Sequence, residues 1–216
     1  MQKTGEIYIF LLSLKTSVLT QQSKMSLNLT NGVTAEQNKI LSYKDNVLVN
    51  APAGSGKTFL LKNFAKYHKG RGLYLAYNAH MAEEVKGSIS CDVSTLHSLA
   101  YRYFSKKSYI TIGSLAKTHT ERDGILLKFT QVNSILERFA NSKLSEAEFF
   151  KNIDGPFEPL LADMRKFKVP VTHDLYLKFY SELGLKLPYD YLMVDEVQDL
   201  SGSSIPFLEN QGSQII

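Results

Sequence analysis

The chain has few of the residues from which proteins build disulfides and metal clusters. Cys91 is the single cysteine among 216 residues, which excludes an internal disulfide and a cysteine-based zinc cluster. The five histidines are scattered, without the spacing of metal ligands. No internal repeat or low-complexity tract is present. These absences indicate a reducing, intracellular setting, which is the cytoplasm in a prokaryote or the nucleus in a eukaryote.

Strong charge and long apolar runs are scarce as well. A net charge of +4 and a pI near 8.9 permit a nucleic-acid partner but are too weak to argue for one. The apolar run at residues 7–14 is shorter than the roughly 20 residues of a membrane span. Glu6 and the lack of a small-residue cleavage pattern disfavour a signal peptide. We therefore expect no membrane partner, and we expect residues 1–24, before a second methionine at Met25, to be an extension outside the main fold.

The remaining sequence is typical of a globular protein, with 44% apolar residues, and strands alternate with helices along it. Short strands are expected at residues 46–50, 72–77 and 90–93. Helices are expected at residues 59–70, where Gly70 would be the C-cap, at residues 79–87 after an Asn78 N-cap, and from Thr95 onward. This alternation predicts an α/β fold with a parallel sheet flanked by helices.

The alternation stops near residue 105. Apolar stripes of helical spacing include Ile125, Leu126 and Phe129, and a capping box at residues 145–148 marks a further helix start. The run "YLMV" at residues 191–194 then returns as a strand. The sequence therefore predicts a helical subdomain at 105–188, inserted into an α/β domain made of 25–104 and 189–216.

The segment "APAGSGKT" lies between an expected strand and an expected helix, which is the context of a phosphate-binding loop. Gly54 and Gly56 would let backbone N–H groups point at phosphate oxygens. Lys57 would neutralise phosphate charge, and the Thr58 hydroxyl would bind Mg²⁺. Ala51 replaces the first glycine of the usual pattern, a position that only shapes the turn, and a plain glycine-rich turn is the alternative. The nucleotide-binding candidates are Ala53, Gly54, Ser55, Gly56, Lys57 and Thr58.

The segment "DYLMVDEVQDLS" carries acids directly after the strand at 191–194. A phosphate-binding loop needs a carboxylate from a neighbouring strand for its magnesium, and a second carboxylate can polarise the attacking water. Asp195 fits the first role and Glu196 the second. Acids that are merely solvated at a strand end are the alternative.

The segments "TAEQNKIL", "NAPAGSGKT", "STLHSLAYR" and "YLMVDEVQDLS" together resemble the first RecA-like half of UvrD/Rep-type superfamily 1 DNA helicases. The wording "VTHDLYLKFY" is most similar to the F-box DNA helicase-like branch. The resemblance extends over residues 33–216. It implies a P-loop NTPase of RecA-like fold that uses ATP and Mg²⁺ and acts on single-stranded DNA.

The resemblance also implies roles for single residues. Gln37 matches the glutamine that reads the adenine edge, although Thr34 and Gln37 also fit a capping box, and both interpretations can hold together. Lys57, Glu196 and Gln198 would be catalytic: Glu196 as the general base and Gln198 as the sensor of the γ-phosphate. Thr58 and Asp195 would hold the metal, and Asp199 would brace the loop.

The DNA contacts implied by the resemblance are Tyr77, Asn78, Thr95 and His97. His97 lies off the apolar stripe of its helix, which suits a surface contact, and an ordinary exposed histidine is the alternative. Tyr101 and Tyr103 could stack on bases, with Tyr103 better placed for the core.

The resembling helicases continue into a second RecA-like half beyond the segment that matches "NQGSQII". We expect this chain to be the ATP-binding lobe alone, unable to unwind DNA by itself, with the missing lobe or another protein as partner. A stand-alone nucleotide-binding switch module and an inactive truncated fragment are the alternatives. A small-molecule kinase fits less well, because Gln198 and Gln37 have no obvious use there.

Overall fold

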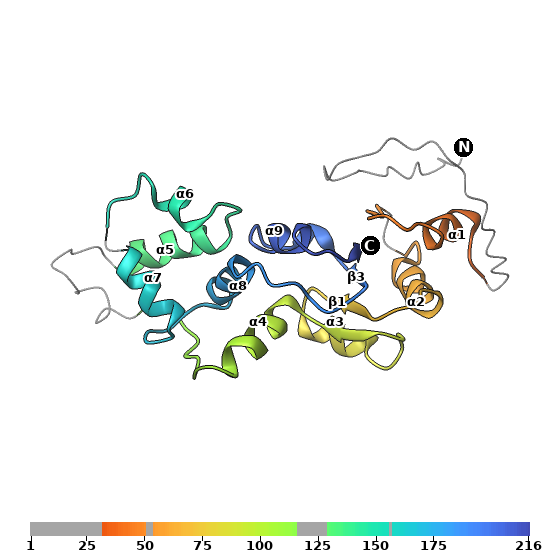
Figure 1. Cartoon of the computed structure of the whole chain (residues 1–216), viewed down its shortest axis with the longest axis horizontal. Helices are drawn as coiled ribbons and strands as arrows, with labels where there is room; N and C mark the ends of the chain where they lie inside the picture. Colours follow the sequence, from red (N-terminus) through yellow and green to blue (C-terminus); the bar gives the residue numbers. More distant parts are fainter. Residues whose placement is uncertain (1–31, 51–53, 116–128, 156) are drawn as a thin grey trace. The chain divides into compact units, whose positions relative to one another are not determined.

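The computed structural model describes residues 32–50, 54–115, 129–155 and 157–216 (Figure 1). The predicted extension at 1–24, the loop residues Ala51 and Ala53, and the stripe residues Ile125 and Leu126 lie outside the described residues. The described chain forms two compact units, each presented by itself below. The first contains the described residues up to Val93 together with Pro188–Asp195 and Gly212–Ile216, and the second contains Ser94–Leu187 and Glu196–Gln211.

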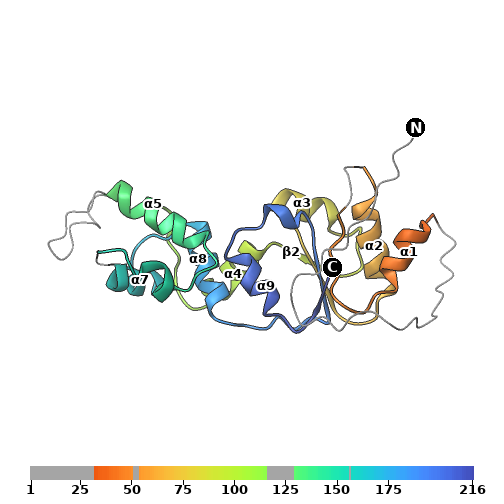
Figure 2. The same ribbon diagram turned by 90° about the horizontal axis from the view of Figure 1, so that it is seen from above.

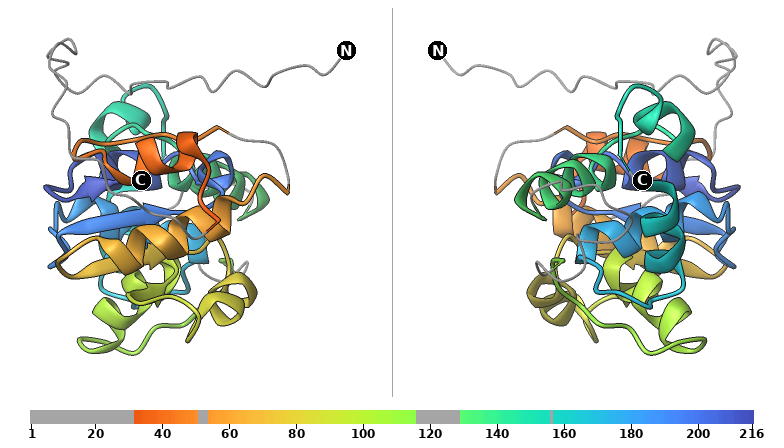
Figure 3. Two further views of the ribbon diagram at one scale, coloured as in Figure 1. Left: turned by 90° about the vertical axis from the view of Figure 1, so that its right-hand side faces the viewer. Right: turned by 90° about the vertical axis from the view of Figure 1, so that its left-hand side faces the viewer.

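The first unit is built on the predicted sheet. Its four strands, β1 (Gly72–Leu75), β2 (Asp92–Ser94), β3 (Tyr191–Val194) and β4 (Gln214–Ile215), have the order β2-β1-β3-β4. β1 pairs with β3 in parallel, in the register Gly72 to Tyr191, and β3 pairs with β4 in parallel. Figure 3 shows β1 and β3 as gold and blue arrows side by side. The α/β fold with a parallel sheet flanked by helices is confirmed.

The helices of this unit are α1 (Ala35–Leu41), α2 (Lys57–Tyr67) and α3 (Ala79–Val85). α1 packs against α2, and the two lie side by side in Figures 1 and 2. α3 begins at the predicted N-cap, because the Asn78 side chain accepts a hydrogen bond from the Met81 N–H. Apolar side chains from α2 and the central strands form the core, among them Leu61, Phe64, Tyr74 and Met193. Gly72 is required in β1, since a Cβ there would overlap the ring of Tyr191.

The expected strand at residues 46–50 is wrong, because the described residues there form no regular ladder. The Val47 N–H donates to the Ile215 carbonyl at 2.9 Å, but the Ile215 N–H donates to the Asn46 side chain instead of to a backbone carbonyl. The side-chain bond takes the place of the second ladder bond, so the segment runs beside β4 without forming a strand.

The predicted C-cap of α2 is also wrong. The helix ends at Tyr67 with His68 as its C-cap, whose backbone N–H donates to the Phe64 carbonyl. Gly70 follows with φ of 112°, in the conformation that suits glycine. It turns the chain so that the Arg71 N–H can donate to the Asp190 carboxylate at 2.6 Å. The glycine therefore shapes the entry into β1.

The second unit is helical. It contains α4 (Leu96–Ser105), α5 (Phe129–Ala140), α6 (Glu146–Phe150), α7 (Phe157–Arg165), α8 (His173–Glu182), the 3₁₀ helix η3 (Val197–Asp199) and α9 (Ser204–Glu209). α8 is its central helix and packs against α4, α5 and α9. The consecutive residues 175–180 of α8 are all buried. The predicted helical character of this region is confirmed, and the predicted domain boundaries stay a prediction.

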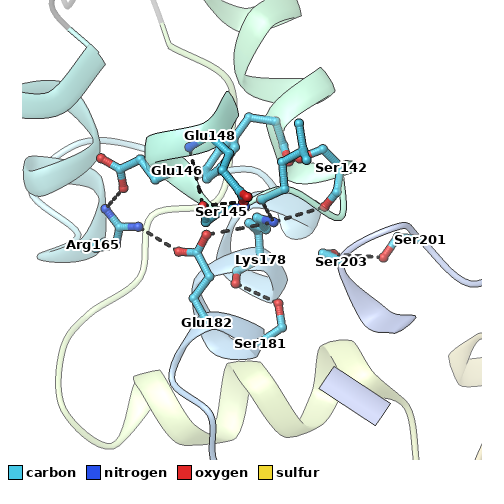
Figure 4. A network of polar contacts seen from close by, with 12 residues as sticks. Ser142, Ser145, Glu146, Glu148, Arg165, Lys178, Ser181, Glu182, Ser201 and Ser203 are labelled. Atoms are coloured by element: carbon cyan, nitrogen blue, oxygen red, sulfur yellow. Dashed lines mark hydrogen bonds and ion pairs between the residues drawn. The ribbon is translucent and has the colours of Figure 1, made fainter. Parts of the chain in front are cut away.

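A polar network joins the helices of this unit (Figure 4). Lys178 on α8 is 3% exposed, and its ammonium donates to the carbonyls of Ser142 at 3.0 Å and Leu144 at 2.6 Å. Arg165 forms ion pairs with Glu146 and Glu182. Burial lowers the pKa of Lys178 from its ordinary value, because desolvation disfavours the charged form. The network fixes α6 and the end of α5 to α8.

Candidate functional site

The phosphate-loop residues that the structure describes lie at the start of α2. Gly54 and Gly56 have φ of 76° and 87°, a conformation that glycine adopts without strain. Gly56 is the N-cap of α2, and within the described residues no side chain caps this helix. The first turn contains no acidic residue. The N–H groups and the positive end of the helix dipole therefore favour an anion at this position.

Lys57 and Thr58 are the first two residues of α2, so both side chains start from the helix end that favours anions. Lys57 is half-buried and Thr58 is exposed. A compact ammonium beside a helix N-terminus binds phosphate as a point charge. A hydroxyl at the second position suits Mg²⁺, which prefers oxygen ligands and is commonly shared with substrate phosphates.

Gln37 lies next to this loop. Its amide nitrogen is 3.3 Å from the point where a Cβ on Gly56 would stand. The Gln37 side-chain oxygen accepts a hydrogen bond from the Thr34 backbone N–H at 3.1 Å. The Gln37 backbone N–H donates to the Thr34 hydroxyl at 3.2 Å. The capping box is therefore confirmed, and it holds the amide with its nitrogen toward the loop. The role in reading adenine stays a prediction.

Asp195 comes directly after β3, at the carboxyl end of the sheet. It is 8% exposed, and its N–H donates to the Leu75 carbonyl at 3.1 Å, which extends the pairing of β3 with β1. The Tyr74 hydroxyl donates to its carboxylate. A buried carboxylate at a strand end, oriented by a second side chain, is the kind of group that holds a metal ion beside phosphates.

Glu196 has a backbone conformation that is rare outside glycine, with φ of 50° and ψ of 50°. Such a residue costs about 1–2 kcal/mol and persists only where its surroundings require it. The Gln198 amide donates to the Glu196 carboxylate, and η3 begins immediately after it. Gln198 and Asp199 are exposed. The turn therefore holds the two predicted catalytic side chains, Glu196 and Gln198, in contact with each other.

The predicted DNA contacts divide between the two units. Tyr77 is 47% exposed and follows β1, and Asn78 caps α3 with its side-chain oxygen. Thr95 is 6% exposed and its hydroxyl caps α4, accepting from the Ser98 N–H at 3.1 Å. His97 is half-exposed, with its Nε2 atom 3.3 Å from Asp174. Two of the candidates, Asn78 and Thr95, therefore have structural roles as helix caps, whereas Tyr77 and His97 expose their rings.

Two residues that contact predicted site residues, Tyr74 and Asp174, were not predicted from the sequence. Tyr74 was read as a strand residue, and the only available signal was a hydroxyl on an otherwise apolar strand. Asp174 was not singled out, since its partner His97 is 77 residues away in the chain. Across the described residues, no group of three or more histidines, cysteines or acids could hold a metal ion by itself. Mg²⁺ in proteins is usually bound by one or two side chains together with substrate phosphates and several waters, so Thr58 and Asp195 would be sufficient protein ligands.

The comparisons with known proteins identify the type of domain. A family model described as an AAA domain matches residues 35–210, which include α1, α2 and the acids after β3. The chain matches no curated protein and no solved structure. No helix among the described residues is long and apolar enough to cross a membrane.

Proposed function

Because the chain belongs to the AAA domain family of P-loop proteins, a domain type found in UvrD/Rep-like helicases, we propose that it binds and hydrolyses Mg-ATP. We propose further that hydrolysis is coupled to translocation along single-stranded DNA. The observation that carries the proposal is the uncapped start of α2 after Gly54 and Gly56, together with the buried carboxylate of Asp195 at the end of β3. The start of α2 would supply the anion site, and Asp195 would supply the metal ligand. The assignment to the F-box DNA helicase-like branch belongs to the same proposal and rests on "VTHDLYLKFY".

The proposed roles follow from the chemistry of each group. Lys57 binds the phosphates, and Thr58 and Asp195 hold the magnesium ion, which supplies charge neutralisation for phosphoryl transfer. Glu196 accepts the proton of the attacking water, and Gln198 orients that carboxylate. Gln37 presents its amide to the adenine. Ala53 completes the loop, as the resemblance implies.

The DNA part of the proposal rests on the position of the candidate residues at the carboxyl ends of the strands. β1 and β3 run parallel, so Tyr77, Asn78 and Asp195 all follow carboxyl ends of strands. Ligands of open parallel sheets bind outside the carboxyl ends of the strands. A DNA strand in contact with Tyr77 and Asn78 would therefore lie close to Asp195, the proposed metal ligand. This arrangement is suited to coupling ATP hydrolysis to DNA binding.

Single-turnover hydrolysis of ATP tests the catalytic proposal, because it resolves slow rates. Glu196→Gln should keep the affinity for Mg-ATP within about 2-fold and lower the hydrolysis rate by about 100-fold or more, the usual contribution of a general base. Glu209→Gln, at an exposed acid of α9, is the matched control and should hydrolyse ATP at the unaltered rate. Equal rates for the unaltered chain and Glu196→Gln would contradict the role of Glu196.

A further inference from the structure

The segment that follows the turn of Glu196 and Gln198 lies against the end of α5, within the helical unit. Gly202 makes the closest approach, because a Cβ on this residue would overlap the backbone carbonyl oxygen of Asn141. The same Cβ would lie 3.0 Å from the Asn141 carbonyl carbon and 3.4 Å from that of Ser142. The φ of Gly202 is not in the left-handed region, so its backbone conformation alone would accept alanine. The glycine is therefore required by this contact with the chain after α5.

Hydrogen bonds hold the backbone that Gly202 contacts. The N–H groups of Asn141 and Ser142 donate to carbonyls in the last turn of α5, at 3.1 Å and 3.0 Å. The Ser142 carbonyl also accepts a hydrogen bond from the buried ammonium of Lys178 at 3.0 Å (Figure 4). Because backbone atoms form this surface, no flexible side chain could move aside for an added methyl group. The segment that contains Gly202 would have to move instead.

Backbone hydrogen bonds connect Glu196 to this segment. The Asp199 N–H donates to the Glu196 carbonyl at 2.9 Å, and the Leu200 N–H donates to the Val197 carbonyl at 3.3 Å. These bonds close η3 and leave the chain between residues 196 and 202 little freedom to absorb a shift. Glu196 also has φ of 50°, a conformation that persists only where its surroundings hold it. A displacement of Gly202 would therefore reach Glu196.

Serine hydroxyls and α9 hold the chain on the other side of Gly202. The Ser201 hydroxyl lies 3.1 Å from the hydroxyl of Ser203 and 2.8 Å from that of Ser204. Ser203 and Ser204 are both buried. α9 begins at Ser204 and packs against α8. Because the chain after Gly202 is held in this way, a methyl group added at Gly202 would displace mainly the chain before it, toward Glu196.

We propose that Gly202 is a positioning residue for ATP hydrolysis, and that its contact with the Asn141 backbone sets the position of the Glu196 carboxylate. Gly202 acts through Glu196, the proposed base, and through the Gln198 amide that donates to it. This inference rests on the proposed function, since it requires the chain to hydrolyse ATP. A misplacement of about 1 Å can lower the rate of an enzyme by about 100-fold, so a contact at this distance from the base can control the rate.

Gly202→Ala adds one methyl group at the contact, and single-turnover hydrolysis of ATP by the whole chain measures its effect. The rate should fall by about 10-fold to 100-fold, while the Kd for Mg-ATP stays within about 2-fold because the loop at 54–58 is unaltered. Gly212→Ala is the matched control, since a Cβ there would meet nothing within 4 Å among the described residues, and it should change neither value. An unaltered rate in Gly202→Ala, or equal losses of rate and affinity, would overturn the positioning role.

A double-mutant cycle shows whether Gly202 acts through Glu196. In a chain that already carries Glu196→Gln, Gly202→Ala should lower the remaining hydrolysis rate by less than about 2-fold, because the base whose position it disturbs is no longer present. A loss as large as that caused by Gly202→Ala alone would show an effect independent of Glu196, and the assignment would then be wrong.

Ser201→Ala decides the question if Gly202→Ala does not fold. It removes the hydroxyl contacts with Ser203 and Ser204 without adding an atom, and should lower the hydrolysis rate by about 2-fold to 10-fold at unchanged affinity. Ser201→Thr keeps the hydroxyl and should restore the rate, whereas an unaltered rate in Ser201→Ala would contradict the proposal. If the unaltered chain binds Mg-ATP without hydrolysing it, the role of Gly202 and the catalytic part of the proposed function both fail, while the nucleotide site stands.

Discussion

At the scale of single residues, the contact between Tyr74 and Asp195 supports both stability and the candidate metal site. The tyrosine is fully buried and its hydroxyl donates to a carboxylate that is 8% exposed. Tyr74→Phe leaves that carboxylate with one donor fewer, and hydrogen bonds to charged groups contribute about 1.5–3 kcal/mol. We expect a loss of that size in the free energy of unfolding, measured by urea denaturation. Tyr109→Phe should stay within about 0.5 kcal/mol of the unaltered chain, and an equal effect of both changes would contradict this role.

A second residue-scale prediction concerns acid. The pKa of Asp174 is lowered in the folded state from its ordinary value of 3.8, first by the hydrogen bond with His97. A depressed carboxyl pKa means that the unfolded chain binds more protons, so this contribution to stability is present above pH 3.8 and lost as pH falls through the lowered value. Asp174→Asn should therefore flatten the decline of stability below about pH 4, measured by thermal unfolding against pH. An unchanged dependence of stability on pH below about 4 would contradict the contribution of the hydrogen bond between Asp174 and His97.

At the scale of elements, Lys178 joins α8 to the chain that leaves α5. Its ammonium serves two backbone carbonyls, those of Ser142 and Leu144, and is itself buried. Lys178→Met keeps the length of the side chain but leaves both carbonyls without this donor, so we expect a destabilisation of about 1–3 kcal/mol by urea denaturation. Lys166→Met, at an exposed position of the same unit, should have little effect. A neutral or stabilising result at Lys178 would show that the desolvation cost exceeds the value of the bonds.

Elements with local signals were predictable from the sequence. The starts of α3, α4 and α6 follow from Asn78, Thr95 and Ser145, because each cap bonds to an N–H within its own first turn. β1 and β3 follow from short apolar runs. The prediction of a strand at 46–50 was wrong because a strand also needs backbone hydrogen bonds to a partner strand. Asn46 accepts the Ile215 N–H of β4 with its side-chain oxygen instead of its backbone carbonyl.

At the scale of the whole molecule, the sequence predicted the order of the motifs but not their long-range partners. The sequence separation of 121 residues between Tyr74 and Asp195 carries no pattern that could be read in advance. The same holds for the packing of α4 against α8, which no local pattern indicates. The loop at 54–58 could be recognised in advance, because its glycines, Lys57 and Thr58 follow one another in the chain, and its binding of phosphate stays a prediction. The pairing of that loop with Asp195 was expected from the sequence, whereas the contact of Tyr74 with Asp195 required the fold.

The central claim is that the start of α2 binds the phosphates of Mg-ATP through Lys57. Isothermal titration calorimetry of the unaltered chain with Mg-ATP, beside Lys57→Ala, tests this claim most directly. A charge-assisted contact of about 1.5–3 kcal/mol predicts an affinity at least about 10-fold weaker in Lys57→Ala. Lys66→Ala, an exposed position in the last turn of the same helix, should retain the affinity of the unaltered chain. Equal affinity of the unaltered chain and Lys57→Ala, or no binding by either, would contradict the account.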